Sequence, residues 1–311
     1  MARANLGLEL DDTIGSDTGA VGYCDGHVVA LVESRPDRAV GRAFGVARKH
    51  GASQIDILCQ QGAGLVARRC GPFEAPTSVW QIDGTSLSEA EAEPVGDPVP
   101  PPDVALAFVP SIEAAGATAV VEHGVVVGEV RGLEVARVVV DEGGPRLLVG
   151  VSTDDRIMNE LIHPEQPAQS VLAQVVEAVA PHRTRGADPH PFNRLSRERW
   201  LRSMLIDEPS LVGFDWLAAA PPPAARVNLS DPAPAVALGA RGGAEAVVVI
   251  SCGVDLELVP FAADARLHLA PSGGLVIVVP ERDAVGFTRG LVGSVRDGAE
   301  LATVPNDWFG L

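Results

Sequence analysis

The chain has 311 residues, of which 46% are hydrophobic and 21% charged, and its formal net charge is -17. This is the composition of a globular protein with room for two domains, and it excludes global disorder. The acidic balance excludes a protein that coats nucleic acid non-specifically, because phosphate affinity comes from cationic side chains that displace counterions. Acidic residues interrupt the N-terminal segment, and no apolar run reaches the roughly 18 residues of a membrane span. We therefore expect a soluble cytoplasmic protein without a membrane partner.

Residues 1–85 predict an N-terminal α/β unit in which strands alternate with helices. The strands are short apolar runs at residues 27–33 (HVVALVE), 54–59 (QIDILC) and 78–83 (SVWQID). Residues 38–50 lie between the first two runs, follow Pro36 and end before Gly51, as a helix does. Residues 64–73 predict a second, short helix. The order is strand, helix, strand, helix, strand.

A glycine-rich turn follows the second of these strands. Gly62, Gly64 and Ala67 fit the pattern G-x-G-x-x-A, which lets backbone amides at a helix N-terminus approach a pyrophosphate. Asp83 lies about 20 positions later, where an acidic residue would bind the ribose. A tight strand-to-helix turn that needs glycine only for its backbone freedom explains the same residues. A nucleotide-dependent enzyme with Gly62, Gly64 and Asp83 as cofactor-binding residues is thus one hypothesis, while the cofactor, any catalytic residue and catalysis itself stay open.

Two proline-rich segments divide the chain. Residues 86–103 combine proline with acidic residues, and residues 219–235 are dominated by proline and alanine, so both are expected to be linkers. Residues 104–218 lie between them. Within this middle region, residues 117–140 are rich in valine and broken by glycines, which is typical of an antiparallel meander. Residues 170–180 predict a helix that covers one face of the meander.

The middle region also carries carboxylates on or near its predicted strands, at Glu122, Glu129, Glu134 and Asp141. Clustered carboxylates on adjoining strands can hold Mg²⁺ for phosphodiester cleavage. Arg131 and Arg137 are interleaved with them, however, and alternating charge on the solvated face of a sheet explains the same pattern. The four cysteines form no C-x-x-C pair. We favour the solvated face and predict no metal site.

Residues 236–311 repeat the order of the first part. Strands are predicted at residues 246–251, 275–279 and 299–304, with helices at residues 255–269 and 287–296. Such alternation favours parallel strands joined by helical crossovers. The expected fold class is therefore α/β, with two β-α-β-α-β units from the chain ends, which can pack together, and an inserted α+β middle region.

The clearest local reversal of charge lies in residues 183–202. A helix is predicted over residues 194–206, capped by Asn193. Its arginines come in pairs three residues apart, so each pair shares a helical face and could bind a phosphate or carboxylate: Arg194 with Arg197, and Arg199 with Arg202. Ion pairs with the chain's own carboxylates are one alternative. Docking on a protein partner is another, because Trp200 belongs to an apolar stripe of the same helix.

Three segments resemble an uncharacterised conserved family of actinobacterial proteins: residues 132–139 (GLEVARVV), 189–202 (PHPFNRLSRERWLR) and 253–266 (GVDLELVPFAADAR). The resemblance implies a cytoplasmic location and no particular activity. The leading hypothesis is a soluble binding or regulatory protein that recognises an anionic small molecule or a protein partner through residues 183–202, with nucleic acid as a weaker candidate. A nucleotide-dependent enzyme and a purely structural interaction protein are the alternatives.

Overall fold

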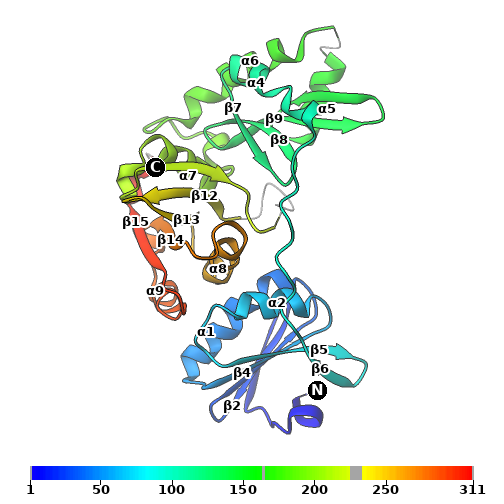
Figure 1. Ribbon diagram of the computed structural model, residues 1–311, viewed down its shortest axis with the longest axis vertical. Helices are drawn as coiled ribbons and strands as arrows, with labels where there is room; N and C mark the ends of the chain where they lie inside the picture. Colours follow the sequence, from blue (N-terminus) through cyan, green and yellow to red (C-terminus); the bar gives the residue numbers. More distant parts are fainter. Residues whose placement is uncertain (1, 163–164, 225–232, 310–311) are drawn as a thin grey trace. The chain divides into compact units, whose positions relative to one another are not determined.

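The computed structural model describes residues 2–162, 165–224 and 233–309, and within them the chain has an α/β fold with three β-sheets (Figure 1). The longest of the described helices have 12 residues. None of the helices in these ranges combines the length and the apolar character of a membrane-spanning segment.

The chain forms two compact units. The N-terminal unit comprises Met1–Gly96, Gly253–Ile277 and Ala284–Leu301. The second unit comprises Asp97–Cys252, Val278–Asp283 and Ala302–Leu311. Neither unit is a single stretch of sequence, because the C-terminal part of the chain contributes to both.

Sheet 1 belongs to the N-terminal unit. Its strands follow the order of the sequence: β1 (Asp12–Ser16), β2 (Gly19–Cys24), β3 (His27–Val32), β4 (Gln54–Cys59), β5 (Thr77–Asp83) and β6 (Ser86–Glu89). The three predicted strands, β3, β4 and β5, are parallel, and antiparallel hairpins extend the sheet at both edges. Strands β1, β2 and β6 were not predicted, and β1 and β6 are short strands that carry no apolar run. Strand β6 occupies the start of the expected linker 86–103, and residues 90–102 form no regular element.

Two helices connect the parallel strands of sheet 1, as predicted. Helix α1 (Val40–His50) buries Val40, Ala43, Phe44 and Ala47, whose three- and four-residue spacing forms one apolar face. Gly51 ends the helix in the left-handed conformation, with φ 64°, which glycine adopts without strain. Helix α2 (Ala63–Cys70) packs against β5. Five of the six residues of β4 are buried, which explains the near-continuous apolar run of this strand.

A helix from the C-terminal part of the chain completes this unit. Helix α8 (Leu258–Leu269) packs against both α1 and α2. The side chain of Asp264 in α8 is fully buried and accepts hydrogen bonds from Arg68 Nε at 2.8 Å and from Arg69 Nε at 3.1 Å. Because an unpaired carboxylate is costly to bury, this contact favours one packing position of α8 on α2.

Sheet 2 lies in the second unit and is an antiparallel meander. Its strands are β7 (Thr118–Glu122), β8 (Val125–Val130), β9 (Leu133–Asp141) and β10 (Gly144–Val149). Glycines form the turns at Gly124 and Gly132, whereas Gly128 lies inside β8, where the register shifts. Helix α6 (Ala168–Val179) packs on β9 and β10 and shares their hydrophobic core. The predicted meander and its covering helix are both confirmed.

Sheet 3 has the strand order β11 (Trp216–Ala220), β12 (Ala235–Arg241), β13 (Ala244–Ile250), β14 (Gly274–Pro280) and β15 (Glu300–Val304). Helix α7 (Arg197–Asp207) contacts β11, β12 and β13. The last three strands were predicted. Strands β11 and β12 were not predicted, because alanine-rich runs beside proline lack a clear strand pattern. Their ends overlap the expected linker 219–235. Residues 225–232 of that linker lie outside the described residues.

The remaining helical segments are short: η1 (Ala2–Leu6), η2 (Pro36–Arg38), α3 (Asp103–Leu106), α4 (Val109–Ala114), α5 (Thr153–Ile162), η3 (Ala180–Arg183), η4 (Pro191–Arg194), η5 (Pro209–Val212), η6 (Glu281–Asp283), α9 (Gly286–Val292) and η7 (Asn306–Phe309).

Candidate functional site

The arginines of α7 meet carboxylates of sheet 2. Arg202 Nη1 donates to Glu122 Oε1 at 2.8 Å, and its Nη2 lies 3.2 Å from Glu129 Oε2. Arg199 donates to the same two side chains, at 2.9 Å from Nη1 to Glu129 Oε1. The exposed fraction of these four side chains is 14% for Arg199 and at most 8% for the others. Internal pairing, one of the alternatives considered, therefore describes Arg199 and Arg202, whose charges are neutralised inside the protein instead of facing a ligand.

The same contacts correct the expectation of a solvated face for three of the four carboxylates, whereas Asp141 is exposed and pairs with Arg146. Glu122, Glu129 and Glu134 are 8%, 3% and 5% exposed. Glu134 accepts hydrogen bonds from Arg137 at 2.8 Å and from Arg156 at 2.7 Å, and these guanidinium groups hold its pKa below the usual value although burial opposes them. A solvated face fails as an explanation because helical segments cover this part of the sheet. Across the described ranges, no three His, Cys, Asp or Glu side chains are placed to hold a metal ion.

The rest of the basic segment is built around Arg183. This side chain is fully buried and donates to the carbonyl oxygens of Phe192 at 2.9 Å, Leu195 at 2.7 Å and Arg131 at 2.7 Å, with its guanidinium over the Trp200 ring. Burial lowers the pKa of Arg183 to about 10. The arginine thus ties the loop before α7 to the turn between β8 and β9.

Helix α7 begins later than predicted. Asn193 does not cap it, because Pro191–Arg194 forms the separate turn η4 and the Asn193 amide donates to Asp188 O at 3.3 Å. Arg194 is exposed, and Arg197 is half-buried at the first position of α7. The four predicted arginines therefore do not form one common site.

The glycine-rich turn before α2 is used for packing. A Cβ atom on Gly62 would lie 2.6 Å from Pro36 Cγ, and one on Gly64 would lie 3.0 Å from Glu93 Cβ. Neighbouring residues of the chain thus lie against both glycines, where a side chain would not fit. Asp83 is exposed in the β5–β6 hairpin, where it pairs with Ser86. The tight-turn explanation accounts for both glycines, and the nucleotide-binding role of Gly62, Gly64 and Asp83 stays a prediction.

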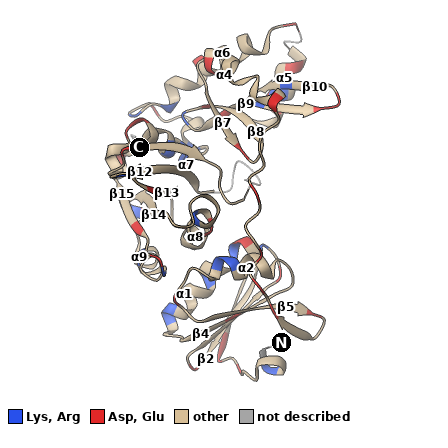
Figure 2. Ribbon diagram, in the orientation of Figure 1, with Lys and Arg blue, Asp and Glu red and all other residues tan. Residues whose placement is uncertain are grey.

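A polar cavity of about 240 Å³ lies at the N-terminal end of α1. Its polar lining includes Thr18, Arg35, Arg38, Arg42, Asp255 and Glu257. The last two come from the loop before α8, which can approach α1 so closely because position 41 is glycine. A Cβ atom on Gly41 would lie 1.9 Å from Leu256 O. Figure 2 shows how basic residues gather on α1 and α2.

The arginines of this cavity differ in their partners. Arg38 forms a forked pair with Asp255, at 3.0 and 3.2 Å. Arg35 forms a similar pair with Asp37, at 3.0 and 3.1 Å. Arg42 is half-buried, and its Nη1 is buried without a hydrogen-bond partner in the structure. A buried donor without a partner costs about 1–3 kcal/mol, so an incoming acceptor would be favoured at this atom.

Glu257 lies in the same cavity and is 4% exposed. Its Oε1 accepts a hydrogen bond from the Gly41 amide at 2.8 Å, which caps the first turn of α1, and its Oε2 is buried without a hydrogen-bond partner. Burial raises the pKa of Glu257 to about 7, although Arg69, the Gly41 amide and Arg38 favour the ionised form. The carboxyl group therefore gains or loses its proton near neutral pH.

This raised pKa predicts a pH dependence of stability. The folded protein holds the Glu257 proton up to about pH 7, whereas the unfolded chain releases it near the ordinary glutamate pKa of 4.5, so the folded state binds more protons between these values. Its stability should accordingly fall as pH rises from about 4.5 to 7 and then level off, as far as this group is concerned. Urea unfolding at several pH values should show a flatter profile for Glu257→Gln than for the wild type. Parallel profiles would contradict the assignment.

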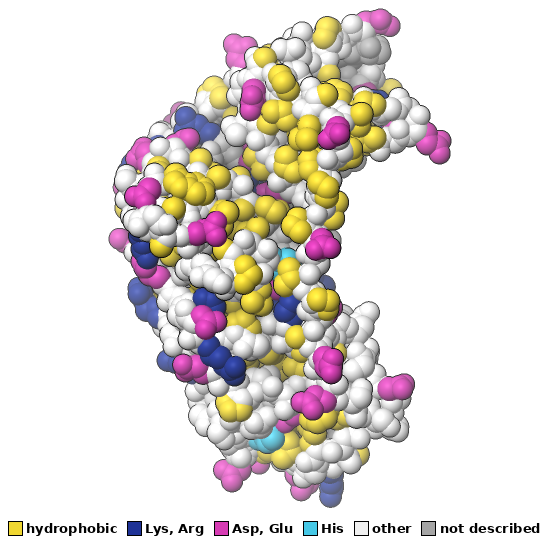
Figure 3. Space-filling view, viewed as in Figure 1, with side chains coloured by type: hydrophobic (Ala, Val, Ile, Leu, Met, Phe, Trp, Pro, Cys, Tyr) yellow, Lys and Arg dark blue, Asp and Glu magenta, His cyan; other side chains and the backbone are white. Residues whose placement is uncertain are grey.

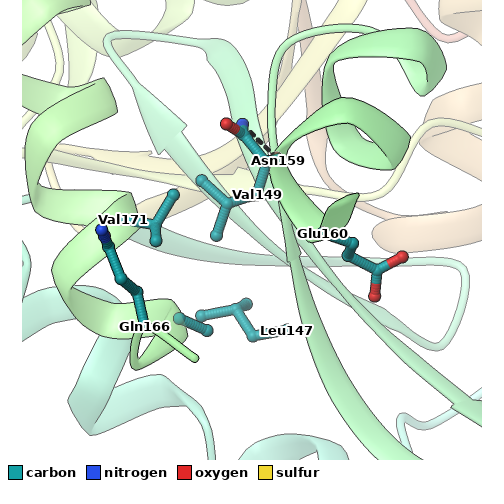
Figure 4. A pocket seen from close by; sticks show the side chains of 7 residues that line it. Leu147, Val149, Asn159, Glu160, Gln166 and Val171 are labelled. Atoms are coloured by element: carbon teal, nitrogen blue, oxygen red, sulfur yellow. Dashed lines mark hydrogen bonds between the residues drawn. The ribbon is translucent and has the colours of Figure 1, made fainter. Parts of the chain in front are cut away.

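A second cavity, of about 310 Å³, lies between β10, α5 and α6 (Figure 4). Two of its polar residues are already engaged, since Asn159 Nδ2 donates to Val149 O at 2.9 Å and Glu160 pairs with Arg146 at 3.2 Å. Helix α5 also carries exposed apolar side chains, among them Leu161 at 70%, and Figure 3 shows hydrophobic side chains gathered over the second unit. This cavity offers apolar area but no free charge.

The cavity at α1 was not predicted, although the spacing of its arginines in the sequence could have indicated it. Arg35, Arg38 and Arg42 are spaced by three and four residues, which places them on one side of a helical start. Glu257 lies at the end of the loop before α8, about 215 positions further along the chain than Arg42. The arginines and Glu257 come to line one cavity only because the loop before α8 packs on α1.

Two further polar features have structural explanations. Asp56 accepts a hydrogen bond from Trp80 Nε1 at 2.6 Å and pairs with His27, so one carboxylate links β3, β4 and β5. Burial raises the pKa of the Cys59 thiol to about 12 and raises that of Cys252 as well, so both thiols stay protonated and are poor nucleophiles.

Comparisons with known proteins add no assignment to this geometry, since no family model, curated protein or solved structure matches the chain.

Proposed function

We propose that this protein binds a small anionic ligand in the cavity at the start of α1 and acts as a binding or regulatory protein. The observation that carries the proposal is the buried Nη1 of Arg42, which has no hydrogen-bond partner and belongs to a residue that lines a polar cavity. Arg35 and Arg38 line the same cavity, where Asp37 and Asp255 balance their charges, so Arg42 is the arginine of the cavity lining that is left for a ligand. Guanidinium groups bind carboxylates and phosphates through charge-assisted hydrogen bonds, which are about twice as strong as neutral ones.

The size of the cavity limits the ligand. Pockets for drug-sized molecules have volumes of about 300–1,000 Å³, and this cavity holds about 240 Å³. An inorganic oxyanion or a short carboxylic acid fits better than a dinucleotide. The proposal keeps the anionic ligand expected for the basic segment and transfers it from Arg199 and Arg202, which are paired internally, to Arg42. The exposed apolar face of α5 supports the alternative of an interaction protein, but it offers no charged group to a small ligand.

Replacing Arg42 by alanine should weaken anion binding about tenfold or more, because a charge-assisted hydrogen bond to the ligand is lost. Titration calorimetry with inorganic phosphate and with short carboxylates would measure the effect. Lys49→Ala is the matched control, since it removes the same charge from an exposed position on the same helix. Equal affinities of the wild type and Arg42→Ala would contradict the proposal, provided that both proteins are folded.

A further inference from the structure

Arg42 and Glu257 each bring to the cavity at the start of α1 a buried atom without a hydrogen-bond partner, and the two atoms need opposite kinds of partner. Arg42 Nη1 is a donor without an acceptor, and Glu257 Oε2 is an acceptor without a donor. Both residues line the cavity, and the Glu257 side chain is almost completely buried, so bulk water does not readily satisfy its free oxygen. A ligand that satisfies both groups must accept a hydrogen bond at one end and donate one at the other.

Building on the proposed function, we infer that the ligand is an oxyanion that carries its own hydroxyl hydrogen, as monohydrogen phosphate does, and that Glu257 selects it. An ionised carboxylate only accepts hydrogen bonds. The hydroxyl of monohydrogen phosphate donates to Glu257 Oε2, while another phosphate oxygen accepts from Arg42. Sulfate has nearly the same size and shape but no hydrogen at neutral pH. Its oxygens would face the carboxylate without a proton between them, and a site built to hold a hydroxyl rejects an analogue that lacks it.

The surroundings of Glu257 determine when this selection operates. The Gly41 amide of α1, Arg38 of η2 and Arg69 of α2 favour the ionised carboxylate. Burial and the neighbouring carboxylate of Asp255 favour the protonated acid, and the balance puts the pKa at about 7. Cys70 of α2 also faces this group, and its own raised pKa keeps it a neutral thiol.

Two protonation states follow, with different ligand preferences. At about pH 8, one unit above the pKa, Glu257 is mostly ionised and accepts only. At about pH 5.5 it is mostly protonated and can itself donate a hydrogen bond, so a fully deprotonated oxyanion is no longer rejected.

Equilibrium dialysis of the full chain against radiolabelled inorganic phosphate and sulfate would test the inference. At about pH 8 the wild type should prefer phosphate over sulfate by about tenfold or more, because sulfate leaves the Glu257 acceptor unsatisfied. At about pH 5.5 the preference should fall to about threefold or less, since the protonated acid removes that penalty. Glu257→Gln should bind sulfate at about pH 8 nearly as well as phosphate, because the amide can donate.

The outcomes separate the two proposals. Equal binding of phosphate and sulfate by the wild type at about pH 8, with binding lost in Arg42→Ala, would overturn the selection by Glu257 and leave anion binding intact. Retention of neither anion would overturn the selection by Glu257, and it would overturn anion binding as well if short carboxylates gave no binding in the calorimetric titration. The pH comparison uses the wild type alone, so the inference can be refuted even if Glu257→Gln does not fold.

Discussion

Arg202→Met is expected to lower the free energy of unfolding by about 3–5 kcal/mol, which is the usual effect of removing one partner from a buried ion pair. The side chain of Arg202 is 2% exposed, and those of Glu122 and Glu129 are 8% and 4% exposed. Methionine retains most of the apolar stem of arginine. The loss of stability therefore comes mainly from Glu122 and Glu129, which lose one of their two arginine partners and keep Arg199. Urea unfolding followed by circular dichroism would measure the change.

Arg194→Met is the matched control, since Arg194 lies in the same basic segment but is exposed. Its effect should stay within about 0.5 kcal/mol, as is usual for surface substitutions. If both variants unfolded at the same urea concentration as the wild type, the cluster of Arg199, Arg202, Glu122 and Glu129 would not be the structural element described above.

Asp264→Ala should be comparably severe, again by about 3–5 kcal/mol. The carboxylate is fully buried and accepts from Arg68 and Arg69, and the side chain of Arg69 is itself only 2% exposed. Its removal leaves the Arg69 guanidinium buried between α2 and α8, where it still donates to the Asp37 carbonyl oxygen at 2.6 Å. Thermal unfolding of the variant should therefore begin at a clearly lower temperature.

Asp83→Ala is the matched control for Asp264→Ala, because it changes the net charge by the same amount at an exposed position of a hairpin. We expect it to unfold with the wild type. A loss of stability as large as that of Asp264→Ala would show that net charge, and not the buried contact, controls the transition. No loss in Asp264→Ala would contradict the proposed seating of α8.

The local sequence pattern was sufficient to predict most of the helices and strands. The apolar runs at β3, β4 and β14 and the glycine at the end of α1 predicted segments that the structure confirms to within a few residues. Two of the strands that were missed, β1 (DTIGS) and β6 (SLSE), are polar edge strands. Their pairing depends on a neighbouring strand and leaves little trace in their own composition.

The candidate sites were less predictable, because charge in a sequence does not reveal its partner. Arg199 and Arg202 stood out as an anomaly in an acidic chain, yet their partners Glu122 and Glu129 lie about 70–80 positions away. Gly62 and Gly64 matched a phosphate-binding pattern, but the segments that fill their space, at Pro36 and Glu93, are not part of the motif.

The sequence by itself determined the alternation of strands and helices, the valine-rich meander and the presence of a local excess of arginine, since each is a property of neighbouring residues. Only the tertiary structure decided which charges are neutralised and which are left without a partner. The physical reason is that desolvation and ion pairing depend on contacts between distant segments. Carboxylates of sheet 2 neutralise Arg202, whereas Arg42 and Glu257 line one cavity, the first with an unpaired donor atom and the second with an unpaired acceptor atom.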